Sequence, residues 1–197
     1  MRIIQIIMPN LYIIAGCNGA GKTTASFTVL PEILDCQEYV NADEIAKGLS
    51  PFNPDRAAIE AGRIMLGKIN YFLTKQIDFS FETTLATRSY TNIIKQAQQL
   101  DYEITLIYFW LDSVNLAIER VRTRVSEGGH DIPQNVIVRR YYSGLKNLFD
   151  LYIPICNCWM IFNNSKPTFE LIAEGNFNKN LKIENNRIFE KLKSYQK

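Results

Sequence analysis

The chain has 197 residues, of which 47% are hydrophobic and 21% are charged, a composition that excludes a disordered or fibrous protein and predicts one globular domain with at most a small attachment. The net charge of +2 is too small to capture nucleic acid by charge alone, so no nucleic-acid partner is expected. The longest apolar runs, 11–15 and 104–111, fall far short of the roughly 20 residues of a membrane helix and predict strands, with no membrane association.

The start of the chain, MRIIQIIMPN, is a poor match to a secretory signal, whose apolar region spans about 7–15 residues before a small-residue cleavage site. The cysteines lack both the CxxC spacing of redox motifs and the paired spacing of zinc sites, and we interpret them as reduced thiols. These features together predict a cytoplasmic protein. The four cysteines are Cys17, Cys36, Cys156 and Cys158.

Apolar, β-prone segments alternate with helical patterns along the chain, which is typical of a parallel sheet covered by helices on both faces. We therefore expect an α/β fold of three layers with a five-stranded parallel sheet. Residues 1–175 would form the domain, with a lid at about 113–149, and residues 176–197 a C-terminal surface helix or tail. In chain order we predict strand 11–15, helix 22–30, strand 38–41, helix 54–75, strand 78–82, helix 89–99, strand 103–111, helices 113–127 and 133–149, and strand 159–162.

The most informative motif is GCNGAGKTT, which follows the first predicted strand and opens the first helix. It fits the GxxxxGK[ST] phosphate loop, in which glycines let backbone N–H groups surround a phosphate at a helix N-terminus. Lys22 would bind the outer phosphates, and Thr23 would bind Mg²⁺. The absence of a guanine-reading NKxD element favours ATP over GTP. The predicted nucleotide-binding residues are Gly16, Cys17, Asn18, Gly19, Ala20, Gly21, Lys22, Thr23 and Thr24.

Asp43 lies just after the second predicted strand, in the segment NADEIA. Active sites of parallel sheets form beyond the carboxyl ends of the strands, where a carboxylate could accept the proton of an attacking hydroxyl. Aspartate is also among the best helix N-caps. The residues alone leave both roles open.

Two further strands end in polar residues. The third places Glu82, Thr83 and Thr84 at the exit of the sheet, with Arg88 just beyond, and this group suits contacts to substrate hydroxyls, although either threonine could cap a helix instead. The fourth is followed by Asp112, which is placed either to coordinate Mg²⁺ or its waters or to cap the next helix.

Arginines gather in the next two predicted helices. Helical spacing places Arg120 and Arg124 on one face and Arg122 on the other, and Arg139 and Arg140 follow in the second helix. Arginine forks bind the oxyanions of a phosphoryl group and stay charged. The alternative is a solvated basic face.

The two arginine helices are joined by the segment EGGHDIP. Gly128 and Gly129 would give this connection the flexibility of a lid. His130 is the only histidine of the chain, which rules out a histidine metal cluster, and we interpret it as a hydrogen-bonding loop residue.

The segments GCNGAGKTT, NADEIA, FETTL and RVRTRVSEGGHDIP, followed by VRRYYSGL, resemble the zeta-toxin family of P-loop kinases over roughly residues 11–165. The resemblance implies an adenylate-kinase-like strand order, ATP and Mg²⁺, and phosphoryl transfer to a hydroxyl. In the best-known members the acceptor is UDP-N-acetylglucosamine and a small antitoxin blocks the ATP site. This chain lacks their long insertions around the sugar-nucleotide pocket, so a sugar nucleotide is one candidate acceptor among small molecules.

The resemblance also implies roles for individual residues. Asp43 corresponds to the base, Lys22 and Thr23 to the phosphate and magnesium ligands, and Glu82 with Thr83 to a substrate contact. The arginines that neutralise the moving phosphate correspond to Arg124 and Arg140, with Arg120 a weaker candidate.

These observations predict a kinase that transfers the γ-phosphate of ATP to a small-molecule hydroxyl. One alternative is an ATPase that couples hydrolysis to a partner or a conformational change, with Asp112 as its magnesium carboxylate. Another is a nucleotide-binding toxin module controlled by an antitoxin.

Overall fold

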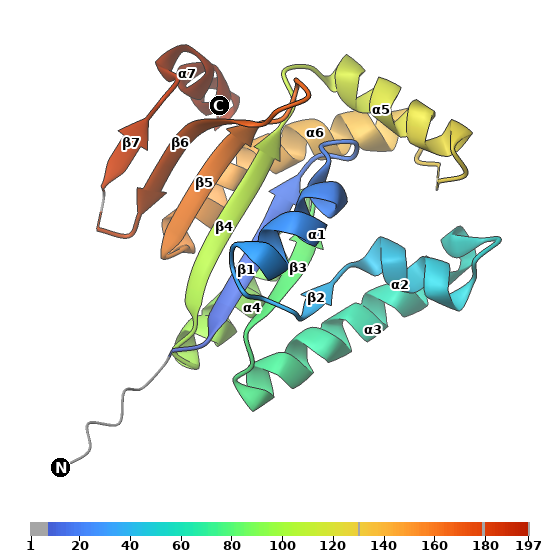
Figure 1. The fold of residues 1–197 in the computed structure, drawn as a ribbon, viewed down its shortest axis with the longest axis horizontal. Coiled ribbons are helices and arrows are strands. Elements are labelled where there is room, and N and C mark those ends of the chain that lie inside the picture. The colour runs from blue at the N-terminus through green and yellow to red at the C-terminus, as the bar shows by residue number, and fades with distance from the viewer. Residues whose placement is uncertain (1–7, 130, 179, 197) are drawn as a thin grey trace.

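The computed structural model of the chain describes residues 8–129, 131–178 and 180–196. Its centre is a seven-stranded sheet with the order β2-β3-β1-β4-β5-β6-β7 (Figure 1). The first five strands in this order are parallel, and β6 and β7 are each antiparallel to the strand before. The strands are β1 (Asn10–Gly16), β2 (Tyr39–Val40), β3 (Phe79–Thr83), β4 (Glu103–Trp110), β5 (Cys158–Asn163), β6 (Glu170–Asn176) and β7 (Leu181–Ile183).

The predicted α/β class is confirmed, but the predicted five-stranded parallel sheet is wrong, because the sheet has seven strands and is mixed. The two strands that the sequence did not reveal have weak local patterns. β6 reads ELIAEGN and β7 only LKI, and neither has a continuous run of buried residues like those of β1 and β4. Their conformation depends on pairing of β6 with β5 and of β7 with β6, which a local apolar pattern does not record.

The central strands β1 and β4 are buried on both faces, which explains their nearly continuous apolar sequences. Helix α1 (Lys22–Glu32) covers one face of the sheet, and α4 (Tyr90–Gln99) and α6 (Gln134–Asn147) lie behind the other (Figure 1). After α6 the chain continues through a π-helical turn, Leu148–Tyr152, and a 3-10 turn, Ile153–Ile155. In the described parts of the chain, no helix is both long and apolar enough to cross a membrane.

Two helices, α2 (Ala42–Leu49) and α5 (Val114–Ser126), lie near the carboxyl ends of the parallel strands. Helix α3 (Pro54–Lys75) forms a hairpin with α2 beside the β2 edge and runs back toward the start of β3 (Figure 1). A small cluster of Ala46, Ala57 and Ala61 joins the two helices of the hairpin. Ala42 and Ile45 of α2 also pack against the main core.

The C-terminal segment packs against the sheet. The boundary predicted at residue 175 falls one residue before the end of β6, and the chain then adds β7, α7 (Asn186–Lys193) and a 3-10 turn, Ser194–Gln196. Leu192 is fully buried, and the Phe189 ring stacks on Trp159 of β5 with centroids 6.3 Å apart. Residues 186–193 therefore form an amphipathic helix whose apolar face is buried.

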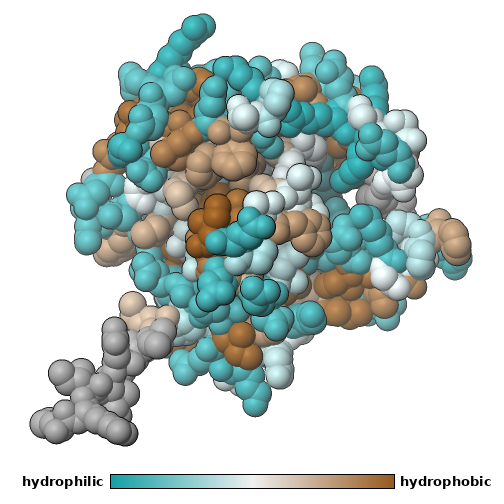
Figure 2. Space-filling model, viewed as in Figure 1, coloured by the Kyte–Doolittle hydropathy of each residue, from teal (hydrophilic) through white to brown (hydrophobic). Residues whose placement is uncertain are grey.

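The surface seen in this orientation is mostly hydrophilic, with separate apolar areas between the polar residues (Figure 2). Individual large apolar side chains are exposed, among them Phe52 at 102% and Ile59 at 75% on or before α3. Single exposed apolar residues of this kind are common on folded proteins.

Candidate active site

The phosphate loop connects β1 to α1, and its glycines adopt positive φ angles that other residues rarely adopt. Gly16 has φ +145°, and a Cβ there would lie 2.3 Å from the carbonyl oxygen of Phe109. Gly21 has φ +78° and precedes α1 without any side-chain cap. The first N–H groups of α1 are therefore available to an anion, in the conformation that this motif requires.

Arg120 of α5 and the segment just after β5 brace this loop. The Asn164 side chain donates a hydrogen bond to the Ala20 carbonyl (2.8 Å), and Arg120 donates to the carbonyls of Asn164 (2.8 Å) and Ser165 (3.3 Å). Burial raises the pKa of the Cys17 thiol to about 11, so this side chain is neutral near pH 7. Cys17 therefore contributes its carbonyl, which accepts a bond from Lys22 Nζ at 3.0 Å.

The Glu82 carboxylate, at the end of β3, meets the start of α1. Its Oε1 lies 3.4 Å from Lys22 Nζ, and its Oε2 accepts a hydrogen bond from the Thr23 hydroxyl at 2.9 Å. Oε2 also accepts from the Tyr39 hydroxyl at 2.5 Å and from Asn41 Nδ2 at 3.0 Å. The strand order explains this meeting, because β3 pairs with β1 and their carboxyl ends lie side by side.

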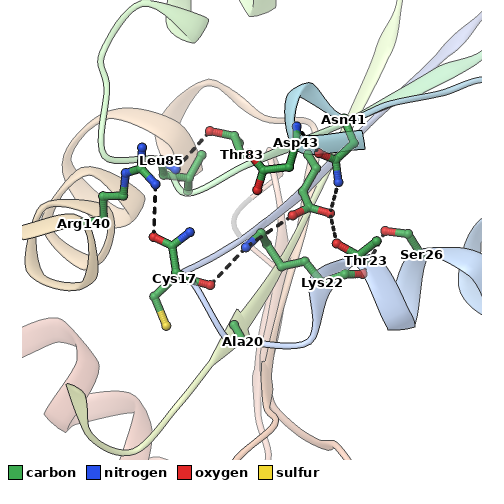
Figure 3. Close-up of polar contacts among 12 residues, drawn as sticks. Cys17, Ala20, Lys22, Thr23, Ser26, Asn41, Asp43, Thr83, Leu85 and Arg140 are labelled. Atoms are coloured by element: carbon green, nitrogen blue, oxygen red, sulfur yellow. Dashed lines mark hydrogen bonds and ion pairs between the residues drawn. The ribbon is translucent and has the colours of Figure 1, made fainter. Parts of the chain in front are cut away.

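Asp43 lies in the first turn of α2, but Asn41 is the N-cap. The Asn41 Oδ1 accepts from the backbone N–H groups of Asp43 (2.8 Å) and Glu44 (3.4 Å). The alternative role of Asp43 as the cap is therefore wrong. In Figure 3, Lys22 and Thr23 of α1 and Asn41 and Asp43 of α2 converge on the same space.

Two clefts meet at these residues. A cleft of about 350 Å³, called the P-loop cleft, is lined by Asn18, Gly19, Gly21, Lys22, Thr23, Thr24, Asp43, Glu82, Arg120, Thr123, Arg124 and Glu127. A cleft of about 390 Å³, called the α6 cleft, is lined by Asn18, Lys22, Asn41, Ala42, Asp43, Glu82, Thr83, Thr84, Ala86, Thr87, Tyr90, Arg139 and Arg140.

Four residues line both clefts: Asn18, Lys22, Asp43 and Glu82. A larger cavity of about 660 Å³ lies elsewhere, on the sheet between Asn10 and Lys182. We place the candidate site at the pair of smaller clefts, because the phosphate loop and the carboxylates converge there.

The arginines divide between the two clefts. Arg120 and Arg124 of α5 line the P-loop cleft, whereas Arg122 points elsewhere and donates to Gln134 at 3.3 Å. Arg139 and Arg140 of α6 line the α6 cleft, and Arg140 donates to the Asn18 side chain at 3.3 Å. The side chain that reaches the phosphate loop from α6 is thus Arg140 (Figure 3).

Thr83 and Thr84 line the α6 cleft, but Thr83 also has a local role. Its hydroxyl accepts a bond from the Leu85 backbone N–H at 3.1 Å, where Leu85 has φ +56°. Thr83 therefore stabilises the turn after β3, while Glu82 contacts the phosphate loop and lines both clefts. Arg88 is exposed and lies outside the residues that line either cleft.

Asp112 also lies outside the lining of both clefts. It is exposed; its backbone N–H donates to the Ser165 hydroxyl and its carbonyl accepts from Lys191. The N-cap of α5 is Ser113, whose side chain accepts from the Leu116 N–H at 3.2 Å. The carboxylate beside Thr23 is that of Glu82.

The two glycines after α5 end the helix. Gly128 has φ +87° and its N–H donates to the Val125 carbonyl, and the Gly129 N–H donates to that of Arg124 at 2.8 Å. This is the usual C-terminal role of a left-handed glycine. His130 lies outside the described residues.

Sequence reasoning missed Tyr39, Asn41 and Asn164 as members of the site. Asn41 had a readable signal, because Asn directly before a helical pattern is a strong N-cap. Tyr39 and Asn164 had none, since their partners Glu82 and Ala20 are distant in the sequence.

The fold and the site define a P-loop nucleotide-binding protein with a kinase-like sheet. The family model for zeta toxin matches residues 3–152, and the chain belongs to the zeta-toxin family, which confirms the resemblance of its motifs.

Other proteins share sequence or fold with this chain. An uncharacterized protein of Haemophilus influenzae is 31% identical over 126 residues, which are 64% of this chain and 88% of the relative. Among solved structures, the AvrRxo1-ORF1:-ORF2 complex with ATP aligns at a TM-score of 0.78 and 16% identity, over 98% of this chain. The chain spans 65% of that structure's length. The PezAT toxin-antitoxin system of Streptococcus pneumoniae aligns at a TM-score of 0.62 and 15% identity, over 85% of this chain and 72% of the other.

Proposed function

We propose that the protein transfers the γ-phosphate of ATP to a hydroxyl of a small molecule. The observation that carries the proposal is that Lys22, Asp43 and Glu82 line two adjoining clefts at once. One of these clefts contains the phosphate loop, and the other extends toward α6. A donor and an acceptor bound in the two clefts would therefore meet beside these side chains, the arrangement that phosphoryl transfer needs.

The phosphate loop would hold the nucleotide through its N–H groups. Lys22 now bonds the Cys17 carbonyl and lies 3.4 Å from Glu82, and it would turn to the outer phosphates when ATP binds. Until then Glu82 pairs with the buried Lys22 ammonium, which limits the free-energy cost of burying this charge. Arg124 and Arg140, with Arg120, would neutralise charge on the transferring group from the two sides.

The residues present fit Mg²⁺. The Thr23 hydroxyl and a Glu82 carboxylate oxygen, 2.9 Å apart, supply oxygen ligands, and Mg²⁺ is usually held by one or two carboxylates together with phosphates and water. When bound, the ion would neutralise charge on the β- and γ-phosphates. The geometry supports Glu82 for this role better than the predicted Asp112.

Asp43 would act as the base. Its carboxylate would take the proton of the acceptor hydroxyl while that oxygen bonds to the γ-phosphorus and the bond from phosphorus to the ADP oxygen breaks. Because Asn41 satisfies the N–H groups at the start of α2, the Asp43 carboxylate is not needed as the cap.

Control by a second protein is part of the proposal. The names of the two solved relatives describe a two-component complex and a toxin-antitoxin system, and we propose a small antitoxin as a partner of this chain. The acceptor is a small molecule, with sugar nucleotides the first class to test. The alternative ATPase reading depends on Asp112, which lies outside both clefts.

The test is to incubate the purified protein with Mg²⁺ and ATP labelled at the γ-phosphate, together with sugar nucleotides, nucleosides or cell extract, and to follow the label by mass. A phosphorylated acceptor supports the proposal. Release of free phosphate alone, dependent on Asp112 and independent of Asp43, would replace it with an ATPase.

A further inference from the structure

We infer that Asn41 is a positioning residue. Its side chain bonds both the first turn of α2, which carries Asp43, and the Glu82 carboxylate, and so holds the proposed base in place relative to Glu82. The inference rests on the proposed function. Asn41 is 6% exposed, and the two ends of its amide bond different parts of the site. The sequence alone predicted no functional role for Asn41.

The oxygen end of the amide controls α2. The Asn41 Oδ1 accepts from the N–H groups of Asp43 at 2.8 Å and Glu44 at 3.4 Å. The strand before it, β2, has two residues, and α2 packs on its neighbours through Ala42, Ile45 and Ala46. The cap bonds the backbone of Asp43 itself, and so it sets how the first turn of α2 presents this side chain.

The nitrogen end of the amide bonds the phosphate side. Nδ2 donates to Glu82 Oε2 and to the Tyr39 hydroxyl, both at 3.0 Å. The same Glu82 oxygen accepts from Thr23 at 2.9 Å and from Tyr39 at 2.5 Å. A shift of Glu82 would therefore be transmitted through Asn41 to the first turn of α2.

Tyr39 supports the same carboxylate oxygen as Asn41. Its hydroxyl donates to Glu82 Oε2 and accepts from Asn41 Nδ2. Asparagine suits position 41 because it both accepts and donates. Serine would cap α2 but lacks the second donor, and aspartate would place a second negative charge beside Glu82.

A pair of variants separates this role from simple capping. Asn41→Ser retains an N-cap oxygen and loses the link to Glu82, whereas Tyr39→Phe keeps the cap and removes one support of Glu82. We expect Asn41→Ser to lower kcat for phosphoryl transfer about 10–100-fold, as for other residues that orient a site, with KM for ATP changed less than about threefold. A wild-type kcat in Asn41→Ser would overturn the inference and leave Asn41 as a cap.

The two variants should also be coupled. If both act through Glu82, the double variant Asn41→Ser/Tyr39→Phe loses less activity than the product of the single losses predicts. Independent, multiplicative losses would contradict a shared route. Melting curves of each variant identify any loss that reflects unfolding alone.

A third measurement does not depend on activity. The Glu82→Ala variant removes the acceptor of Asn41 Nδ2, so we expect the Asp43 amide, bonded to Oδ1, to exchange its hydrogen at least about tenfold faster by NMR, with amides in the middle of α4 unchanged. An unaltered Asp43 amide would overturn the inference even if the enzyme is a kinase. Absence of transfer by the wild-type protein with a faster Asp43 amide would instead reject the proposed function and keep the coupling.

Discussion

The P-loop cleft and the α6 cleft adjoin each other, but they are built in different ways. The P-loop cleft takes half of its lining from residues 18–24, a continuous stretch that runs from the loop after β1 into the first turn of α1. The α6 cleft draws on α2, the segment after β3 and α6, which lie far apart in the sequence. A short motif can therefore specify the P-loop cleft, whereas the α6 cleft, where we propose that the acceptor binds, exists only once the chain has folded.

The strongest test of this division is Asp43, which belongs to both clefts. Asp43→Asn should retain ATP affinity within a few-fold and lower phosphoryl transfer by about 10³-fold, because it removes the proton acceptor and preserves the shape of the side chain. Calorimetry measures the binding and single-turnover assays measure the transfer. The matched control is Asp112→Asn, which lies outside both clefts and should transfer normally. Undiminished transfer by Asp43→Asn would refute its role as the base.

Lys22 should affect both nucleotide binding and chemistry. Lys22→Ala removes the cation that we propose binds the outer phosphates, and we expect transfer to fall about 10²–10³-fold, with weaker ATP binding by calorimetry. Lys47→Ala is the control, since Lys47 is exposed and pairs with Glu44 on the outside of α2. A Lys22→Ala protein with normal ATP affinity would show that the loop amides alone hold the phosphates.

The phosphate loop should tolerate no side chain at Gly16. Gly16→Ala places a Cβ 2.3 Å from the Phe109 carbonyl at φ +145°, so the free energy of unfolding should fall by about 2–3 kcal/mol. Gly62→Ala in α3 is the opposite case, because a Cβ there meets nothing within 4 Å, and it should gain about 0.5–1 kcal/mol. Urea unfolding measures both changes. Equal effects would mean that the loop rearranges freely.

The smallest effect concerns the α6 cleft alone. Arg139→Gln should raise KM for the acceptor about 5–10-fold and leave KM for ATP unchanged, since Arg139 lines only this cleft and arginine favours anionic or polar acceptor groups. Arg122→Gln is the matched control on α5, where the side chain contacts Gln134. If KM for ATP rises instead, the nucleotide extends into the α6 cleft and the two clefts are not separate sites.

The comparison also explains which parts of the site the sequence could reveal. Gly16 to Thr24 are contiguous, so their spacing identified them directly. Asp43 and Glu82 were found because they lie at the carboxyl ends of strands. The sequence predicted Glu82 as a substrate contact and Asp112 as the metal ligand, whereas the Thr23 hydroxyl bonds Glu82. Which strand lies next to β1 decides this contact, and that neighbour is β3.

The sequence by itself determined the α/β class, the phosphate loop and the family, because each depends on local apolar patterns or on residues close together in the chain. Only the tertiary structure decided the two added strands and the union of Tyr39, Asn41 and Glu82. These features arise from sheet pairing and from hydrogen bonds between residues up to 43 positions apart in the sequence. The residues reach these positions only when the sheet assembles.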